Sequence, residues 1–182
     1  MAGTSESQGA RVISVSSRGH FFGGVDFEDP NFECREYDKW KAYGQSKSAN
    51  ALFAVELDRI GQSSGIRAFS LHPGRIVSTD LSRHLTKEEL RAAGALDAND
   101  QIPTDGSVKN IEQGAATNVW CATSPQLDGM GGVYCEDADI SYAISADAKG
   151  TAGVRPWAID KNFAKQLWAL SQKLTGVEFA VP

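Results

Sequence analysis

Three short runs of apolar and β-branched residues alternate along this chain with longer segments of helical periodicity. The runs cover residues 10–16, 66–72 and 131–135, and the first two read Ala-Arg-Val-Ile-Ser-Val-Ser and Ile-Arg-Ala-Phe-Ser-Leu-His. Short runs of this kind, bounded by Gly, Pro and Ser, are typical of strands. We therefore predict three strands, and we expect the first to be buried on both faces, as strands inside a parallel sheet are.

A long helix is predicted between the first two strands, at about residues 38–62. Its apolar residues recur at the spacing of a helix packed on a core, at Ala49, Leu52, Phe53, Leu57 and Ile60. Tyr43 and Lys47 stand four residues apart on one face, which Ala51 and Ala54 continue with small side chains. Strand, helix and strand in this order form a βαβ unit, in which the two strands are parallel.

The second half of the chain predicts three more helices separated by loops. The predicted order is a short helix after Thr86, a turn-rich stretch at 98–107, a helix from Asn110 to about Thr123, a surface loop at 136–155 and a last helix from Asp160 to Gly176. In the last helix, the spacing predicts inward positions for Phe163, Leu167, Leu170 and Leu174. The alternation favours an α/β fold with a doubly wound parallel sheet of about three strands and flanking helices.

Length and composition exclude several classes of protein. The 182 residues are enough for one domain with a sizeable core and few enough that two are not expected. A net charge of −5 gives no basic surface for nucleic acid. No apolar stretch approaches the ~20 residues that span a bilayer. Residues 1–9 are polar and lack the layout of a signal peptide, so we expect a disordered leader there.

The cysteines do not indicate a disulfide framework or a metal site. Cys34, Cys121 and Cys135 are an odd number and contain no Cys-x-x-Cys pair, and the histidines do not cluster with them in sequence. We therefore expect reduced thiols, a cytoplasmic protein and no metal. His72, which precedes Pro73, is interpreted as a structural hydrogen-bonding residue.

Candidate chemistry gathers where the first two predicted strands end. Ser17 follows the first strand and Gly74 follows the second, and ligands bind at this edge in open α/β sheets. The helix with Tyr43 and Lys47 begins on the same side. An ammonium beside a phenol favours the phenolate, and moving the tyrosine pKa from near ~10 by about three units requires roughly 4 kcal/mol. Such a phenol exchanges a proton with an alcohol or carbonyl near neutral pH, and a nearby serine can hold the reacting oxygen.

Two other motifs in the sequence offer alternative interpretations. Tyr37 and Lys41 form a second Tyr-x-x-x-Lys pair, but they lie among charges ahead of the apolar periodicity, so we interpret that pair as accidental. His20 lies near Ser17 and suggests a Ser-His-Asp hydrolase. The run Gly-Gln-Ser-Lys-Ser at 44–48 lacks the final glycine of a nucleophile elbow, and no strand directly precedes its first serine, which disfavours hydrolysis.

These motifs resemble those of the short-chain dehydrogenase/reductase family. The resemblance rests on Arg-Val-Ile-Ser-Val-Ser-Ser at 11–17, Ala-Tyr-Gly-Gln-Ser-Lys-Ser-Ala-Asn at 42–50 and Ser-Leu-His-Pro-Gly at 70–74, and segments 112–117 and 131–134 extend it. Within that family, these motifs are most similar to those of the retinol-dehydrogenase-like and WW-domain-oxidoreductase-like branch. The resemblance implies an NAD(P)-dependent oxidoreductase that interconverts an alcohol and a carbonyl on a small-molecule substrate.

The resemblance also implies roles for individual residues. Ser17 would hold the substrate oxygen, Tyr43 would be the general acid or base, and Lys47 would lower the Tyr43 pKa and bind the nicotinamide ribose. The implied contacts to NAD or NADP are Tyr43, Lys47, Pro73, Gly74, Ile76 and either Ser78 or Thr79. The stretch from 79 to about 107 would be the substrate lid. By analogy with relatives, the helix of Tyr43 and the helix near Ile111 form a possible homodimer face.

The sequence departs from the family pattern at its start. No Gly-rich turn follows a strand near the N-terminus, and Gly-Met-Gly-Gly at 129–132 precedes a strand and is not followed by a helix. We therefore expect residues 10–182 to be the C-terminal catalytic part of a single Rossmann-like domain that binds no dinucleotide tightly alone. The alternative is a truncated, catalytically inactive relative that acts as an interaction module.

The first strand supplies a testable expectation. If no strand pairs with its outer side, residues 10–16 form an apolar edge of the kind that attracts another chain. We predict that the isolated chain is poorly soluble or binds a partner through this edge. Analytical ultracentrifugation and urea unfolding check this expectation, and a soluble monomer that unfolds cooperatively contradicts it.

Overall fold

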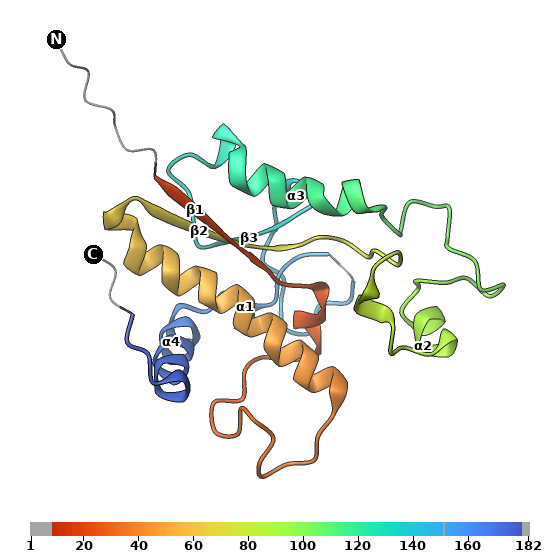
Figure 1. Cartoon of the computed structure of the whole chain (residues 1–182), viewed down its shortest axis with the longest axis horizontal. Helices are drawn as coiled ribbons and strands as arrows, with labels where there is room; N and C mark the ends of the chain where they lie inside the picture. The colour runs from red at the N-terminus through yellow and green to blue at the C-terminus, as the bar shows by residue number, and fades with distance from the viewer. Residues whose placement is uncertain (1–8, 151, 180–182) are drawn as a thin grey trace.

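In the computed structural model, which describes residues 9–150 and 152–179, four strands form one sheet between layers of helices (Figure 1). The strands are β1 (Ala10–Val15), β2 (Ile66–His72), β3 (Val133–Glu136) and β4 (Asp139–Ile140), in this order across the sheet. β1, β2 and β3 are parallel, and β4 pairs antiparallel with β3. The predicted leader at 1–9 lies outside the described residues except for Gly9.

Helices cover both faces of the sheet. They are α1 (Lys39–Gly61), α2 (Lys87–Ala92), α3 (Ile111–Thr123) and α4 (Lys161–Thr175). Figure 1 shows α1 and α3 on opposite sides of the strands, with α4 beside α1. This arrangement confirms the predicted α/β class and doubly wound sheet. Within the described part of the chain, no helix is long and apolar enough to cross a membrane.

The two faces of β2 pack against different helices. Toward α1 the strand presents Ala68, which packs against the fully buried Ala54 and against Leu57. Toward α3 it presents the larger Phe69 and Leu71, which pack against core residues Cys121, Leu127 and Cys135. Small side chains on α1 and on its side of the sheet let the helix lie close to the strands, and this sets the position of everything on its N-terminal turns.

A buried carboxylate fixes the far end of α1. Asp58 accepts hydrogen bonds from Arg67 Nε at 2.8 Å and from the Ala68 backbone N–H at 3.1 Å. A Cβ added at Gly131 would lie 1.8 Å from Asp58 Oδ1, so only glycine fits there. Gly132 has φ +66°, a conformation outside the strand region. The predicted start of the third strand at residue 131 was therefore wrong, and β3 begins at Val133.

The first strand differs from its prediction. β1 ends at Val15, and burial on both faces was wrong because every residue of β1 is either exposed or only partly buried. β1 is also an edge strand within the described sheet. Val15 keeps 45% of its surface exposed. The edge position agrees with the open edge expected from the sequence, while association through it stays a prediction. The two-residue strand β4 was not predicted, since a pattern that short carries no periodicity.

Three other expectations about burial were wrong in part. In α4, Leu167 packs inward as predicted together with Ala164 and Trp168, whereas Phe163 and Leu174 are exposed. Trp168 stacks on Phe53 of α1 with ring centroids 5.7 Å apart, and Phe53 itself is exposed rather than buried. The predicted surface loop at 136–155 ends in a buried segment: Val154 packs in the core, and Arg155 donates hydrogen bonds to three carbonyls of the same loop.

Two histidines are buried where the strand ends meet the segment after β1. His20 accepts a hydrogen bond at Nε2 from the Arg155 N–H, at 3.2 Å, and its Nδ1 lies 2.8 Å from the Ser17 carbonyl oxygen. His72 Nδ1 accepts from the Arg18 N–H at 3.2 Å. Burial lowers the pKa of His20 to about 4 and that of His72 to about 3. Both imidazoles are therefore neutral at pH 7.

These lowered pKa values predict a loss of stability in weak acid. Below about pH 6.5 an unfolded histidine binds a proton that the folded one does not, so each histidine lowers the free energy of unfolding by about 1.4 kcal/mol per pH unit. The loss continues to about pH 4 for His20 and about pH 3 for His72. Urea unfolding between pH 6.5 and 5 measures this slope before most carboxylates titrate.

The slope can be assigned by substitution. We expect His20→Gln to remove about one proton from the pH dependence of the free energy of unfolding. An unchanged slope in this variant would contradict the assignment.

Candidate active site

The carboxyl ends of β1 and β2 lie side by side and open into a pocket. Val15 pairs in register with Leu71, so the residues that follow them, Ser17 and Gly74, reach the same rim of the sheet. A cavity of about 550 Å³ lies at this rim. We call it the rim pocket; Ser17, Tyr43, His72, Gly74 and Ile76 are among the residues that line it.

Hydrogen bonds between α1 and β1, with the turn after it, place Tyr43 at the pocket. Ser16 Oγ donates to the Lys47 carbonyl at 2.6 Å, Ser14 Oγ donates to the Asn50 carbonyl at 2.8 Å, and Asn50 Nδ2 donates to the Val15 carbonyl at 3.0 Å. Ser48 Oγ donates to the Gly23 carbonyl at 2.6 Å. We call the contacts of Ser14, Ser16, Ser48 and Asn50 the α1–β1 seam. It fixes α1 both along and around its axis.

Two glycines let the backbones approach at the seam. A Cβ added at Gly19 would lie 2.3 Å from Tyr43 Cε1, so the Tyr43 ring rests directly on the Gly19 backbone. A Cβ added at Gly44 would lie 2.7 Å from Phe22 Cβ and 3.1 Å from the Gly19 carbonyl oxygen. Any larger residue at either position would push Tyr43 away from Ser17.

The Lys47 ammonium lies beside the ring of Tyr43. Its Nζ is 5.6 Å from the centroid of the Tyr43 ring. The side chain is partly buried, and burial lowers the pKa of the ammonium. Within the described residues, no carboxylate pairs with Lys47, so its charge is directed at the phenol rather than neutralised.

The structure brings some of the predicted site residues together and leaves others apart. Ser17, Tyr43, Gly74 and Ile76 line the rim pocket. Pro73 and Lys47 adjoin those residues without being part of the lining. Gly74 has φ +94°, and a Cβ there would meet Lys109 Cδ at 2.4 Å, so glycine is required. Ser78 and Thr79 are exposed and lie outside the lining.

The two alternative motifs do not form sites. Tyr37 precedes α1, is largely exposed and packs its ring against Phe32 at 5.3 Å, away from the rim pocket. His20 contacts the carbonyl oxygen of Ser17 rather than its hydroxyl, and its other ring nitrogen is taken by the Arg155 N–H. His20 therefore holds the turn after β1 together and is not placed to take a proton from Ser17.

Sequence reasoning missed several residues of the pocket. Arg18 and Arg75 line it, and each directly follows a predicted site residue, which was the available signal. His72, predicted as structural, has the predicted hydrogen-bonding role and also lines the pocket. The apolar walls come from Phe21, Phe22, Trp40, Leu81, Leu85 and Leu90. The last three belong to the predicted lid at 79–107, whose movement stays a prediction.

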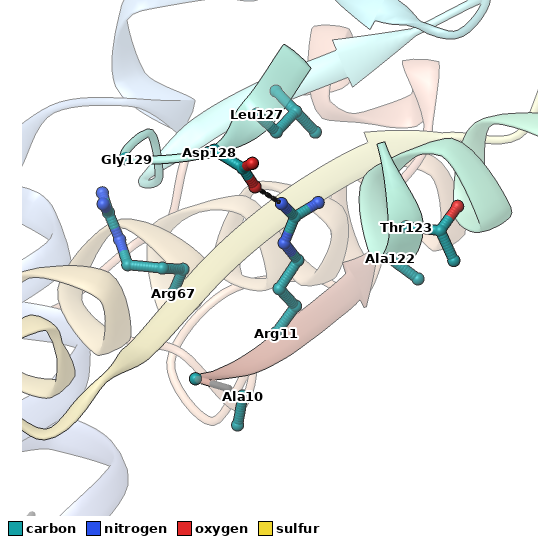
Figure 2. Close-up of a pocket in the computed structure, with 9 residues that line it drawn as sticks. Ala10, Arg11, Arg67, Ala122, Thr123, Leu127, Asp128 and Gly129 are labelled. Carbon is teal, nitrogen blue, oxygen red and sulfur yellow. Dashed lines mark hydrogen bonds and ion pairs between the residues drawn. The ribbon is translucent and has the colours of Figure 1, made fainter. Parts of the chain in front are cut away.

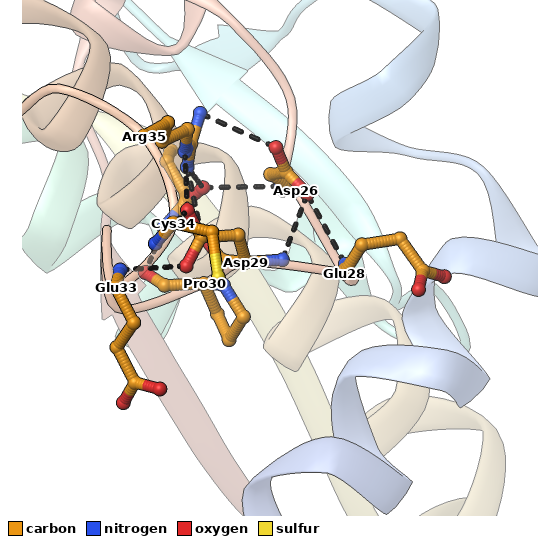
Figure 3. A network of polar contacts seen from close by, with 8 residues as sticks. Asp26, Glu28, Asp29, Pro30, Glu33, Cys34 and Arg35 are labelled. Carbon is orange, nitrogen blue, oxygen red and sulfur yellow. Dashed lines mark hydrogen bonds and ion pairs between the residues drawn. The ribbon is translucent and has the colours of Figure 1, made fainter.

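A polar network braces the loop that leads into α1 (Figure 3). Arg35 forms ion pairs with Asp26 and Asp29, at 3.3 and 3.5 Å. Asp29 accepts from the backbone N–H groups of Glu33 and Cys34. Gln45 of α1 ties this loop to the helix: its Oε1 accepts from Arg35 Nη2 and from the Asp26 N–H. The loop thus buttresses α1 two residues from Tyr43.

A second cavity, of about 620 Å³, lies at the opposite end of β1 (Figure 2). The Arg11 side chain crosses this cavity and forms an ion pair with Asp128 at 2.6 Å. It also donates hydrogen bonds to the Cys121 and Ser124 carbonyls at the end of α3. None of the predicted catalytic residues lines this cavity. In the described residues there is also no cluster of His, Cys, Asp and Glu suited to a metal ion.

Comparison with known proteins gives the chain its relatives. No protein-family model matches it. It is 42% identical over 159 residues to a Streptomyces lividans protein named "Probable oxidoreductase", a match that covers 87% of this chain and 53% of that protein. It is 36% identical to a short-chain dehydrogenase/reductase of Penicillium rubens, covering 91% of this chain and 46% of the relative. Human retinol dehydrogenase 13 is 33% identical, with coverage of 93% and 46%.

A solved structure shares the fold of this chain. The crystal structure of an uncharacterized protein from Mycobacterium paratuberculosis superposes with a TM-score of 0.61 at 29% identity, covering 96% of this chain and 52% of that one. The chain spans about half the length of the curated relatives it matches. The matched regions are the C-terminal parts of those relatives. Over its matched length, the chain belongs to the short-chain dehydrogenase/reductase family as a counterpart of the C-terminal parts of its members.

Proposed function

We propose that this chain carries the catalytic part of an NAD(P)-dependent oxidoreductase that interconverts an alcohol and a carbonyl. The observation that carries the proposal is the meeting of Ser17 and Tyr43 at one pocket, with the Lys47 ammonium beside the Tyr43 ring. These side chains come from two elements that the α1–β1 seam holds together. The names of the relatives, which include an oxidoreductase and a retinol dehydrogenase, support the same reaction class.

Ser17 is suited to hold the reacting oxygen of the substrate. Its Oγ accepts a hydrogen bond from the Gly19 N–H at 3.0 Å. That contact uses an acceptor position of the oxygen and leaves the hydroxyl proton available as a donor. In the proposed mechanism this proton points to the substrate oxygen and orients it toward Tyr43.

Tyr43 is the proposed general acid in reduction and general base in oxidation. Its phenol gives a proton to the substrate oxygen as a carbonyl becomes an alcohol, and it takes the proton back in the reverse direction. The Lys47 ammonium stabilises the negative charge that Tyr43 then carries. Since the side chain of Lys47 is partly buried, this interaction is screened less than it would be at the surface.

The loop that follows β2, which contains Gly74 and Ile76, fits a nicotinamide. Gly74 and Ile76 line the pocket, and the peptide N–H and carbonyl of Ile76 have no hydrogen-bond partner among the described residues. Gly74 and Ile76 would therefore border the ring and its carboxamide, and Lys47 would reach the ribose. The nicotinamide, when bound, supplies or accepts the hydride. The use of NAD or NADP and the contact by Ser78 or Thr79 stay predictions, as does the cytoplasmic location.

The interaction-module alternative has one supporting observation. β1 is an edge strand of the described sheet, with unpaired backbone groups on its outer side. A protein that used this edge only to bind a partner would not depend on Tyr43. A turnover assay therefore separates the two functions.

We predict that Tyr43→Phe abolishes most turnover in a polypeptide that supplies the N-terminal half carried by the relatives. The lost proton transfer should lower kcat by about 10²–10⁴-fold while cofactor binding is largely spared. Tyr37→Phe is the matched control, because Tyr37 has the same spacing to a lysine and lies outside the pocket. Steady-state kinetics and cofactor titration measure both effects. Near-normal turnover of Tyr43→Phe would remove Tyr43 from the mechanism.

A further inference from the structure

The rim pocket contains two arginines without counterions. Arg18 and Arg75 both line it, and within the described residues neither forms an ion pair with a carboxylate. Arg75 Nη1 donates to the Gly94 carbonyl at 3.0 Å, which leaves its charge unpaired. The third cation of the lining, Lys39, differs because it is paired with Glu89. The unpaired charge is thus concentrated on the two arginines that follow Ser17 and Gly74.

Two buried donor atoms beside the pocket also lack partners within the part of the chain that the structure describes. They are Arg18 Nε and His72 Nε2. Because His72 Nδ1 accepts from the Arg18 N–H, the neutral ring carries its proton on Nε2, which is therefore a donor. His72 is only 7% exposed and lines the pocket. An unsatisfied buried donor costs about 1–3 kcal/mol, and an acceptor in the pocket would remove that cost.

Neighbouring charges reinforce this demand for an anion. Burial and the charge of Arg18 both lower the pKa of Arg75, so the Arg75 guanidinium lies within electrostatic reach of Arg18. Asp105 offsets part of this effect at Arg75, and Asp137 acts on His72 but is paired with Lys109. Neither carboxylate reaches Arg18 or Arg75 as an ion pair. Positive charge and buried donors therefore converge on the same space.

We propose that the rim pocket binds the carboxylate of an acidic substrate with an apolar body, held by Arg18 and Arg75 with His72 Nε2–H as a further donor. This inference rests on the proposed function insofar as it calls the ligand a substrate. Guanidinium groups match the planar geometry of a carboxylate. The apolar walls from Phe21, Phe22 and Leu85 suit the rest of such a molecule.

A phosphate of the dinucleotide is the other source of the same anionic chemistry. We favour the carboxylate because Arg18 directly follows Ser17, which places the anion beside the reacting oxygen. A pyrophosphate is bound at a Gly-rich turn and helix N-terminus in dinucleotide-binding folds. Among the described residues, no Gly-rich turn of this kind borders the rim pocket. The N-terminus of α1 does border it through Lys39 and Trp40, but the Asp38 side chain already caps the N–H groups of Trp40 and Lys41.

Binding of octanoate and octanol to the 182-residue chain tests the proposal. The two probes share an apolar body and differ in the carboxylate. We expect octanoate to bind at least about tenfold more tightly, as measured by ligand-detected NMR titration. Arg18→Gln should remove this preference, and Arg18→Lys should retain part of it. Lys173→Gln, which deletes a positive charge from an exposed position on α4 outside the pocket lining, should change nothing.

Each outcome decides the question. Equal binding of the two probes, or an unchanged preference in Arg18→Gln, overturns the proposal. Tighter binding of inorganic pyrophosphate than of octanoate at the same arginines also overturns it, since the anion would then belong to the dinucleotide. If Arg18→Gln fails to fold by circular dichroism, Arg75→Gln replaces it with the same expectation. Because these titrations need no turnover, their failure would leave the oxidoreductase proposal to be judged by Tyr43→Phe alone.

Discussion

The close contact between α1 and the turn after β1 is the constraint on which the site depends. The Tyr43 ring rests on the Gly19 backbone, and Ser16 Oγ is hydrogen-bonded to the Lys47 carbonyl at 2.6 Å. These contacts leave α1 little freedom to slide or rotate. A shift of one residue would carry Tyr43 about 100° around the helix and away from Ser17. The chemistry of the pocket is thus a consequence of how closely small residues let one helix approach one strand.

Three structural features meet at the rim where β1 and β2 end. Parallel strands end together there, which brings their following loops within reach of one ligand. The helix contributes a phenol with a cation behind it. The residues after Ser17 and Gly74 add guanidinium groups whose charges the described residues do not neutralise. A pocket with apolar walls and unpaired cations is costly to maintain unless a ligand uses it. This cost connects the packing of the fold to the proposed binding of an anionic substrate.

The sequence predicted the features that depend on local pattern. The β1–α1–β2 unit, the capped starts of α2 and α3 and the meeting of Ser17 with Tyr43 all follow from periodicity, capping residues and strand order. Features that depend on tertiary context were missed. The start of β3 depends on the contact of Gly131 with Asp58. The inward face of α4 depends on the stacking of the Trp168 ring on the Phe53 ring. The roles of Arg18 and Arg75 depend on the absence of counterions nearby, which spacing along a chain does not reveal.

The most direct test of this account compares two adjacent serines. Ser16 belongs to the seam and Ser17 to the pocket, although both side chains form hydrogen bonds that hold the fold. In a polypeptide with the N-terminal half of the relatives, Ser16→Ala and Ser17→Ala should each lower the free energy of unfolding by about 1 kcal/mol. Ser17→Ala should lower kcat by about 10²-fold or more. Ser16→Ala should lower kcat far less, because the contacts of Ser14, Ser48 and Asn50 still hold α1 in place. Equal kcat values for the two variants would contradict the assignment of Ser17 and Tyr43 to one catalytic site.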